Sequence, residues 1–328
     1  MQALRSMSWQ AGKITTDQPL SELRERVRDQ QALVWIDIMG AVAPYEAFLS
    51  GTFGLAKLVL QTIDEEAERA KFVERNGYCY MVIHGLEYDV QTDTARTPAL
   101  DIVFGKNFLI TAHPDPLAWL DDVYQEIATQ EADAQIMSRG VGFLLYEILD
   151  HHVDSFFPVL DDIDDIIDEL EDVTVSNTSN EVQVRIFRIK RSLAQMRRVI
   201  SPQVEVANSL RARADHLLAP EVQPYLGDVH DHLIRAFEIL DSYRDLMSGL
   251  LDVYLTTVSN RLNAIMKQLA IVATIFLPIT FITGLFGQNF GHSPQVEHDS
   301  GYNFWIVLGV MVIITIGQIW YFKRRGWI

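Results

Sequence analysis

Two long stretches without charged side chains dominate the hydrophobic pattern near the end of the chain. Leu269 to Phe286 spans 18 residues and Phe304 to Phe322 spans 19, and neither contains Asp, Glu, Lys or Arg. A helix needs about 20 mainly apolar residues to cross a hydrocarbon core about 30 Å thick. The pattern therefore predicts two spans through a lipid bilayer, rather than two buried helices of a globular domain.

The charges that flank these stretches indicate an orientation. Lys323, Arg324 and Arg325 follow the second stretch, whereas the linker of residues 287–303 has no Lys or Arg. Lys and Arg are retained on the cytoplasmic side of a membrane. We therefore expect a plasma-membrane protein with both termini in the cytoplasm and the linker outside.

Short β-rich runs alternate with helical runs over residues 1–135. The apolar and β-branched residues predict four strands, the last two joined as a hairpin through Gly105-Lys106-Asn107: Leu33–Ile38, Tyr78–His84, Ala99–Phe104 and Phe108–Ala112. Helices are predicted over Ala43–Thr62 and Leu117–Gln130. These elements indicate a cytoplasmic α/β domain.

From Ser138 onward the apolar residues recur at helical spacing. A long helical hairpin is predicted over residues 136–220, with helices at Val141–Asp172 and Glu181–Leu218. No proline lies between Pro224 and Pro278, so a stalk helix over residues 221–268 is expected to continue into the first span. Its near-heptad apolar stripe requires a packing partner.

Acidic residues are concentrated in the predicted hairpin. Eight of the twelve residues 161–172 are Asp or Glu, and Ile163, Ile166, Ile167 and Leu170 are interleaved with them. The spacing predicts an amphipathic helix with an acidic, solvated face. Such a face either attracts cations or is simply hydrated, and the sequence leaves both interpretations open.

The overall charge favours cations as partners. The chain has 44 acidic and 27 basic side chains and a formal net charge of −17, which argues against nucleic acid. Its single cysteine, Cys79, excludes an internal disulfide. No Walker loop, GxGxxG or GxSxG motif occurs, so an enzyme is not expected.

Two spans per chain limit what a monomer can conduct. One chain with two helices cannot enclose a polar pathway, so conduction would require an oligomer around a central axis. A membrane-anchored stalk that conducts nothing is the alternative.

The first predicted span carries a family resemblance. Residues Met266 to Phe290, which include Gly287-Gln288-Asn289, resemble the first span of CorA-type divalent-cation transporters and its terminal Gly-Met-Asn motif. The similarity extends over further segments of the chain: Tyr146–Asp172, Arg188–Pro202, Tyr225–Asn263 and the basic tail.

The resemblance implies a homopentamer and an α+β multi-domain membrane protein. The α/β domain, helical hairpin and stalk would be followed by a pore-lining span at residues 269–286, an outer loop at 287–303, a second span at 304–322 and a basic cytoplasmic tail at 323–328.

The resemblance also implies where ions pass. Gly287, Gln288 and Asn289 would select the ion, and one helix face would line the pore with Asn263, Met266, Leu269, Ala273, Leu277, Thr280 and Gly284. This face has no carboxylate. Because Mg²⁺ loses its water reluctantly, such a pore would handle a largely hydrated ion through neutral oxygens.

Regulatory ions are a further implication of the resemblance. In the family, divalent ions bound between cytoplasmic domains control gating, and Asp228 matches a position that contributes a ligand. Asp231, His230 and His232 are its neighbours and are candidate additional ligands. A solvated helix turn is the alternative.

The identity of the ion is open to two interpretations. The oxygen-only pore face favours Mg²⁺, with Co²⁺ or Ni²⁺ as surrogates. Gln288 replaces the usual methionine, and a variant residue in the middle of this motif is also found in the ZntB-like branch, which is associated with zinc. His292, Glu297, His298 and Asp299 lie near the predicted outer mouth. Since imidazole favours Zn²⁺, a zinc transporter, proton-coupled or not, is one alternative. A non-conducting membrane-anchored sensor or scaffold is the other.

Overall fold

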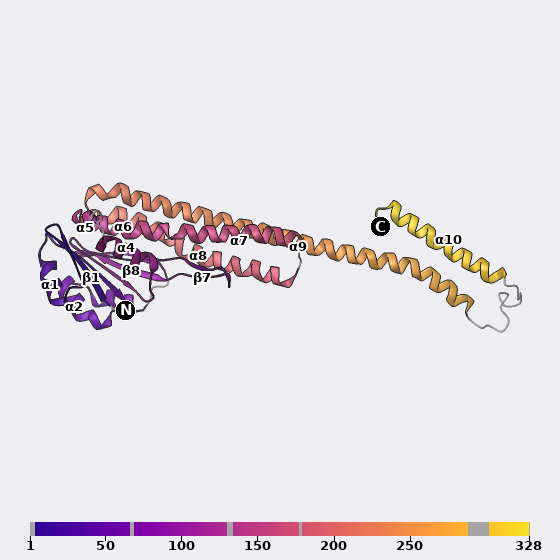
Figure 1. Ribbon diagram of the computed structural model, residues 1–328, viewed down its shortest axis with the longest axis horizontal. Coiled ribbons are helices and arrows are strands. Elements are labelled where there is room, and N and C mark those ends of the chain that lie inside the picture. Colours follow the sequence, from indigo (N-terminus) through magenta and orange to yellow (C-terminus); the bar gives the residue numbers. More distant parts are fainter. Residues whose placement is uncertain (1–3, 66–68, 130–133, 177–178, 288–301, 328) are drawn as a thin grey trace. The chain divides into compact units, whose positions relative to one another are not determined.

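The computed structural model describes residues 4–65, 69–129, 134–176, 179–287 and 302–327 (Figure 1). The chain divides into two compact units, Met1–Leu251 and Asp252–Ile328. The first contains a β-sheet with helices packed on it, and the second contains two apolar helical segments.

A seven-stranded sheet, counted over the described residues, forms the centre of the first unit. Its strand order is β2-β1-β3-β9-β8-β5-β4, and only β3 and β9 are parallel neighbours. The strands are β1 (Leu4–Gln10), β2 (Lys13–Thr16), β3 (Leu33–Met39), β4 (Lys71–Arg75), β5 (Tyr78–His84), β8 (Ala99–Phe104) and β9 (Phe108–His113). Strands β6 (Glu87–Asp89) and β7 (Thr94–Arg96) form a separate ribbon.

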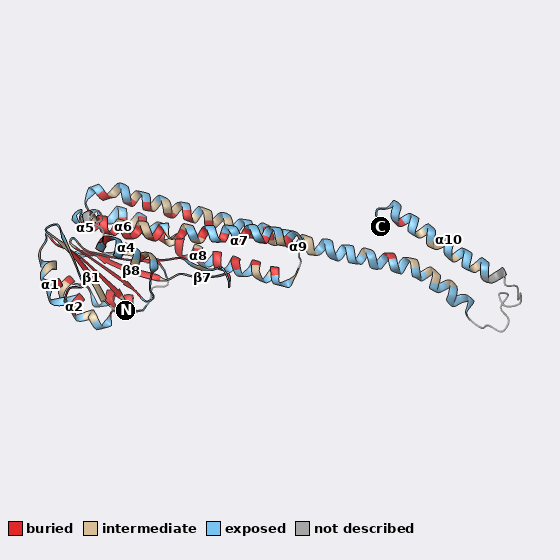
Figure 2. Cartoon of the chain, viewed as in Figure 1, coloured by how far each residue is buried: buried red, intermediate tan, exposed pale blue. Residues whose placement is uncertain are grey.

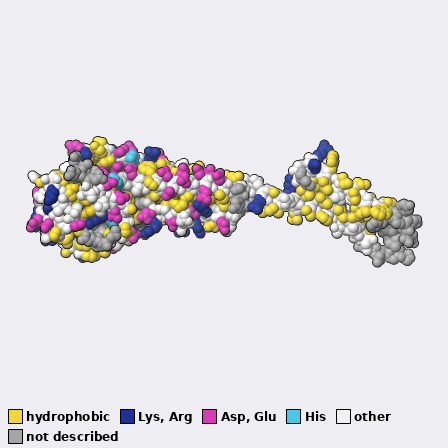
Figure 3. All heavy atoms as spheres, viewed as in Figure 1, with side chains coloured by type: hydrophobic (Ala, Val, Ile, Leu, Met, Phe, Trp, Pro, Cys, Tyr) yellow, Lys and Arg dark blue, Asp and Glu magenta, His cyan; other side chains and the backbone are white. Residues whose placement is uncertain are grey.

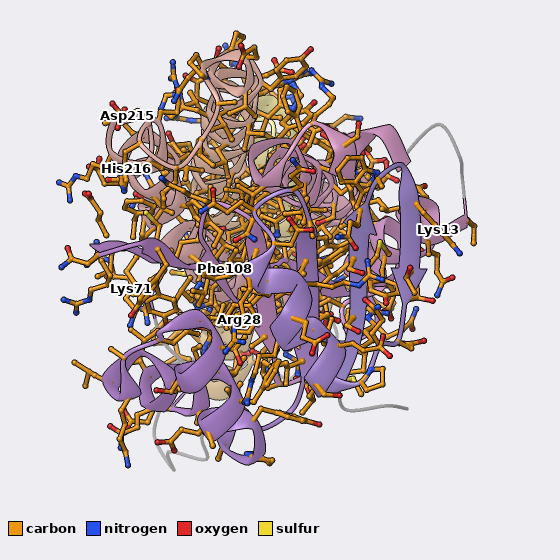
Figure 4. All side chains as sticks on the ribbon, turned by 90° about the vertical axis from the view of Figure 1, so that its left-hand side faces the viewer. Lys13, Arg28, Lys71, Phe108, Asp215 and His216 are labelled. Carbon is orange, nitrogen blue, oxygen red and sulfur yellow. The ribbon has the colours of Figure 1, made fainter. Side chains whose placement is uncertain are left out.

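The edges of the sheet carry lysines. Lys13 belongs to the outer strand β2 and Lys71 to the outer strand β4, and the end-on view in Figure 4 shows them on opposite sides of the molecule. Charged side chains on outer strands discourage pairing with strands of other molecules.

All four predicted strands are present, and the predicted hairpin is confirmed. Strands β8 and β9 pair antiparallel, with Phe104 opposite Leu109. The Gly105 N–H donates to the Phe108 carbonyl at 2.9 Å, and a Cβ at position 105 would collide with the Phe108 ring. Glycine therefore leaves room for the Phe108 ring against this turn.

Helices cover both faces of the sheet. Helices α1 (Leu20–Arg28), α2 (Glu46–Phe53) and α3 (Lys57–Asp64) bury Leu23, Phe53 and Leu60 in one core with alternate strand residues. On the other face Trp35 contacts Tyr124 of α4 (Ala118–Thr129), with ring centroids 5.2 Å apart. Figure 2 shows the strands between these layers as buried.

The prediction of one helix over Ala43–Thr62 is wrong. This segment forms a 3-10 turn (η1, Ala43–Tyr45), then α2, then α3. Gly54 ends α2 in the left-handed conformation, with φ of 70°, and its N–H donates to the Ser50 carbonyl at 3.1 Å. A left-handed glycine is a common helix stop, and it separates α2 from α3 here.

The prediction of one helix over Val141–Asp172 is also wrong. The chain forms α5 (Ala134–Ser138), α6 (Val141–Asp154) and α7 (Phe156–Ser176), with a break at Ser155. Pro158 explains the break, because its ring would clash with the carbonyl four residues earlier, at Asp154.

The acidic face of α7 agrees with its sequence pattern. The eight carboxylate residues between 161 and 172 are exposed, and Ile163, Ile166, Ile167 and Leu170 are buried. The antiparallel partner is α8 (Asn180–Arg213), which ends five residues before the predicted Leu218.

The longest helix, α9 (Gln223–Phe286), follows a short 3-10 turn, η2 (Pro220–Val222), and extends from the first unit into the second. In the first unit Tyr243 of the predicted apolar stripe is half-buried, and the other members are buried: Val229, Leu233, Ala236, Leu240, Met247 and Leu250. In the second unit its residues and those of α10 (Tyr302–Arg324) are mostly exposed (Figure 2).

Two helices within the described residues are long and apolar enough to cross a membrane. One ends at Phe286 and the other covers Trp305–Arg324. Only 6% of the most apolar window of each is buried. Helices of a soluble core would be mostly buried, so the exposed apolar surface is typical of membrane spans.

Candidate functional site

The seven predicted pore residues from Asn263 to Gly284 all lie on α9 within the second unit. They recur every three or four residues, which places them on one side of the helix. Each is exposed, and Met266, Leu269 and Leu277 are 67%, 68% and 71% exposed. Apolar side chains exposed to this extent require lipid or neighbouring subunits as partners.

The Thr280 hydroxyl has a defined role in hydrogen bonding. Its Oγ1 donates to the Phe276 carbonyl at 2.8 Å. A hydroxyl has one proton, so its oxygen lone pairs remain available as acceptors. Thr280 can therefore accept hydrogen bonds from water on this side of α9.

Close contact with the last turn of α9 favours glycine at position 287. The Gly287 N–H donates to the Thr283 carbonyl at 2.9 Å, and a Cβ at position 287 would lie only 3.1 Å from that oxygen. The other residues of the predicted selectivity motif and outer mouth lie outside the described residues: Gln288, Asn289, His292, Glu297, His298 and Asp299.

A glutamine of α10 contacts the turn of α9 that precedes Pro278. Pro278 has no N–H, so it cannot complete the helical hydrogen bond to the Thr274 carbonyl. Gln318 of α10 donates its Nε2 to that carbonyl at 3.0 Å. Because hydrocarbon offers no water to an unpaired carbonyl, this contact satisfies the group and joins the two helices.

The basic tail also contacts α9. Lys267 donates its Nζ to the Gly326 carbonyl at 2.9 Å, and the Trp327 ring stacks on Phe322 with centroids 5.6 Å apart. In the second unit, the part of α9 that carries Lys267 therefore lies beside the basic tail that follows α10.

A group of metal-ligand side chains lies in the first unit. Asp150 and Asp154 of α6 and His232 of α9 have ligand atoms that all lie within 4.8 Å of one another. His232 Nδ1 lies 3.6 Å from Asp154 Oδ1, and its Nε2 lies 4.0 Å from Asp228 Oδ1. We call Asp150, Asp154 and His232 the α6–α9 cluster. Carboxylate and imidazole groups at this spacing are suitable ligands for a divalent cation.

Electrostatics also make the cluster attractive to a cation. Burial raises the pKa of Asp150, and the negative charge of Asp154 raises it further. Two carboxylates that share a site repel each other when both are ionised. A bound cation would relieve this repulsion and favour both ionised forms.

The structure separates the two predicted regulatory residues. Asp228 lies at the edge of the α6–α9 cluster, whereas Asp231 is exposed and faces His230, with 3.3 Å between His230 Nδ1 and Asp231 Oδ1. Asp150 and Asp154 were not among the predicted ligands. Their i, i+4 spacing, which Asp228 and His232 share, was a usable signal, since such pairs project from one side of a helix.

Surface chemistry differs between the two units. Asp and Glu side chains gather over the helices of the first unit, whereas hydrophobic side chains cover much of the two apolar helices (Figure 3). The first surface favours cations and the second favours lipid.

Comparisons with known proteins agree over nearly the whole chain. The family model described as CorA-like Mg²⁺ transporter protein matches residues 30–324. Cobalt/magnesium transport protein CorA of Thermotoga maritima is 34% identical over 302 residues, which cover 92% of this chain and 85% of that protein. Putative metal ion transporter YfjQ of Bacillus subtilis is 33% identical over 305 residues, 92% of each chain.

A solved structure has the same fold. The CorA magnesium transporter from Methanocaldococcus jannaschii matches with a TM-score of 0.84 and 24% identity over 98% of both chains. This match confirms the predicted arrangement of an N-terminal α/β domain, a long helix that continues into a span and a second apolar helix.

Proposed function

This chain belongs to the CorA-like Mg²⁺ transporter family, and from that membership we propose that it transports divalent cations across a membrane, Mg²⁺ first and Co²⁺ or Ni²⁺ as surrogates. The family is one of transporters, so the chain is not an enzyme. The observation that carries the proposal is the family match over residues 30–324, which includes both apolar helices and most of the first unit.

The proposed pore is formed by a homopentamer with α9 of each subunit around the axis. The exposed apolar residues Met266, Leu269 and Leu277 support this arrangement, because five copies would cover one another and form narrow apolar rings. Such rings can close a pore by excluding water. The positive charges of the tail support an orientation with both termini in the cytoplasm.

The proposed selection acts on a hydrated ion. Thr280 supports it, since its free lone pairs accept hydrogen bonds from the water shell of the ion. At the outer mouth, Gly287, Gln288 and Asn289 would supply carbonyl and amide oxygens in the Gly-Gln-Asn variant of the motif. A ring of five neutral acceptors would select an ion by the geometry of its water shell. It would bind the ion weakly enough to release it into the pore.

The proposed regulation places a divalent ion at the α6–α9 cluster. Its three ligand groups and the adjacent Asp228 support this role, together with the raised pKa of Asp150. An ion that binds the closed state more tightly than the open state shifts the population toward closure. Loss of the ion at low internal concentration would then favour opening.

Zinc is the alternative substrate that specific residues favour. His292 and His298 would offer imidazole ligands near the outer mouth, which suit Zn²⁺ better than Mg²⁺. Substitution of both histidines would then lower zinc flux and leave magnesium flux unchanged. A non-conducting sensor or scaffold would show neither flux in liposomes.

A matched pair of threonines tests the pore face. We expect Thr280→Val to lower Mg²⁺ uptake by proteoliposomes at least about tenfold, because the hydrated ion loses hydrogen-bond acceptors in the pore. A loss of about 1.4 kcal/mol in stabilisation of the passing ion corresponds to a factor of ten in rate. Thr315→Val is the control, because its hydroxyl makes the same kind of contact on the other helix, α10, where it donates to the Met311 carbonyl at 2.8 Å. Equal losses in both variants would contradict the assigned face.

A further inference from the structure

A pocket of about 750 Å³ lies in the first unit, and none of its lining residues belongs to the proposed ion pathway or to the α6–α9 cluster. Its walls come from the β7–β8 connection, the segment after β9 and one side of α8. Small-molecule sites commonly have volumes of about 300 to 1,000 Å³. The pocket therefore has the size of a ligand site.

The charge of this pocket is opposite to that of the chain. Three guanidinium groups line it, those of Arg96, Arg191 and Arg198, against the carboxylate of Asp115. Arg96 is paired with Asp115 at 3.1 Å and with Glu87 at 3.7 Å. Across the described part of the chain, Arg191 and Arg198 form no ion pair and are exposed. A chain with a net charge of −17 thus keeps two arginines beside a cavity without carboxylate partners.

Helix α8 places Arg191 and Arg198 on the side that faces the pocket. Arg191 and Arg198 are seven residues apart on α8, two helical turns, so they lie on the same side of it. Ser192 donates to the Asp93 carbonyl at 2.8 Å and accepts from the Ala95 N–H at 3.2 Å, which holds β7 and Arg96 against α8. The pocket is therefore supported at the end that carries Arg96 and Arg191.

Buried hydrogen bonds hold the opposite end. Gln203 of α8 donates to the His84 carbonyl at 3.0 Å and accepts from the His84 N–H at 3.1 Å. His84 and Val199 are lining residues, and both are buried. Because these walls are already ordered in the free protein, less conformational entropy is lost when a ligand binds.

We propose that this pocket binds a polyvalent phosphate, the charged part of a phosphorylated small molecule. Guanidinium groups bind phosphate oxygens through paired hydrogen bonds, and the two without carboxylate partners, Arg191 and Arg198, match an anion with several negative charges. The net negative charge of the protein does not prevent this, because charges farther than about 8 Å are largely screened at physiological ionic strength.

Equilibrium binding to the purified full-length protein in detergent tests the proposal. The probes are radiolabelled pyrophosphate, inorganic triphosphate and ATP, each at two fixed concentrations of free Mg²⁺, so that chelation is separated from binding. We expect saturable binding of at least one probe. Equal affinity for triphosphate and ATP would support recognition of phosphate alone, and tighter binding of ATP would support recognition of a nucleoside polyphosphate.

Variants of α8 locate the site. In Arg191→Gln/Arg198→Gln we expect binding at least about tenfold weaker, because two charge-assisted contacts are lost. Arg188→Gln is the control, since Arg188 is exposed on the same helix and lies outside the pocket lining. Arg191→Lys/Arg198→Lys keeps the charge and should bind with intermediate affinity. The absence of saturable binding by the wild-type protein, or equal losses in the Arg188 control, would overturn the proposal.

Discussion

Replacement of Gln318 by Leu tests how the two apolar helices are joined at Pro278. In the wild-type protein the Gln318 amide supplies the hydrogen that Pro278 cannot give to the Thr274 carbonyl, over 3.0 Å. Gln318→Leu leaves that carbonyl without a donor in an apolar environment. The substitution should therefore weaken the association of α9 with α10 without any change in charge.

The expected magnitude follows from two opposing contributions. Hydrogen bonds between helices in membranes average about 0.6 kcal/mol and reach about 1.7 kcal/mol. Gln318 also carries a buried Oε1 that has no hydrogen-bond partner among the described residues, and Leu removes this unfavourable group. Because Pro278 leaves the Thr274 carbonyl no donor within α9, the hydrogen bond should contribute close to the upper value, and the opposing gain leaves a net loss of about 1 kcal/mol in the free energy of unfolding for Gln318→Leu.

A second substitution isolates this contact. Pro278→Ala restores an N–H that can donate to the Thr274 carbonyl within α9, so Gln318 becomes redundant. In that background Gln318→Leu should cost close to zero, which gives a coupling energy of about 1 kcal/mol between the two positions. The contact, rather than general packing, would then account for the loss.

The assay is unfolding of purified protein in mixed micelles by increasing SDS, followed by tryptophan fluorescence and circular dichroism. Thr315→Val is the matched control on α10, because the Thr315 hydroxyl donates to the Met311 carbonyl of its own helix at 2.8 Å. An equal cost of Gln318→Leu in the wild-type and Pro278→Ala backgrounds would refute the reasoning.

Three further predictions concern the ion pathway, regulation and pH. Asn289→Ala should abolish selective Mg²⁺ uptake by proteoliposomes and leave the oligomer intact in gel filtration; unchanged uptake would exclude a selectivity ring at this residue. His232→Ala should weaken inhibition of uptake by internal Mg²⁺ about tenfold, and a normal inhibition curve would exclude the α6–α9 cluster as a regulatory site. Burial lowers the pKa of His152 from 6.5 to about 4, so the unfolded chain binds a proton before the folded protein does as pH falls. Stability should decline between pH 6.5 and 4 by about 3 kcal/mol from this residue, and His152→Gln, measured by denaturant unfolding at each pH, should not show that decline.

The sequence predicted elements that local patterns determine. The uncharged stretches, the Gly105 hairpin and the acidic face of α7 follow from periodicity and turn chemistry, and each is present. Strand β1 was missed because Leu4–Gln10 is half polar and becomes a strand through pairing with β3, where Met7 lies opposite Trp35.

Sites made by separate helices were harder to predict. Asp150 and Asp154 lie about 80 positions before His232, and only the packing of α6 beside α9 brings them together. The contact of Gln318 with Thr274 likewise depends on how α10 lies against α9. Sequence periodicity gives the face of each helix but not its partner or its register against that partner.

Uptake of Mg²⁺ and Zn²⁺ into proteoliposomes, measured with ion-sensitive dyes in the presence and absence of cobalt hexammine, tests the central claim most directly. Cobalt hexammine resembles a hydrated divalent ion in size and cannot exchange its ligands readily. If the pore passes hydrated Mg²⁺, the liposomes will take up Mg²⁺ and cobalt hexammine will block that uptake. Uptake of Zn²⁺ alone, driven by a pH gradient and insensitive to cobalt hexammine, would contradict the account.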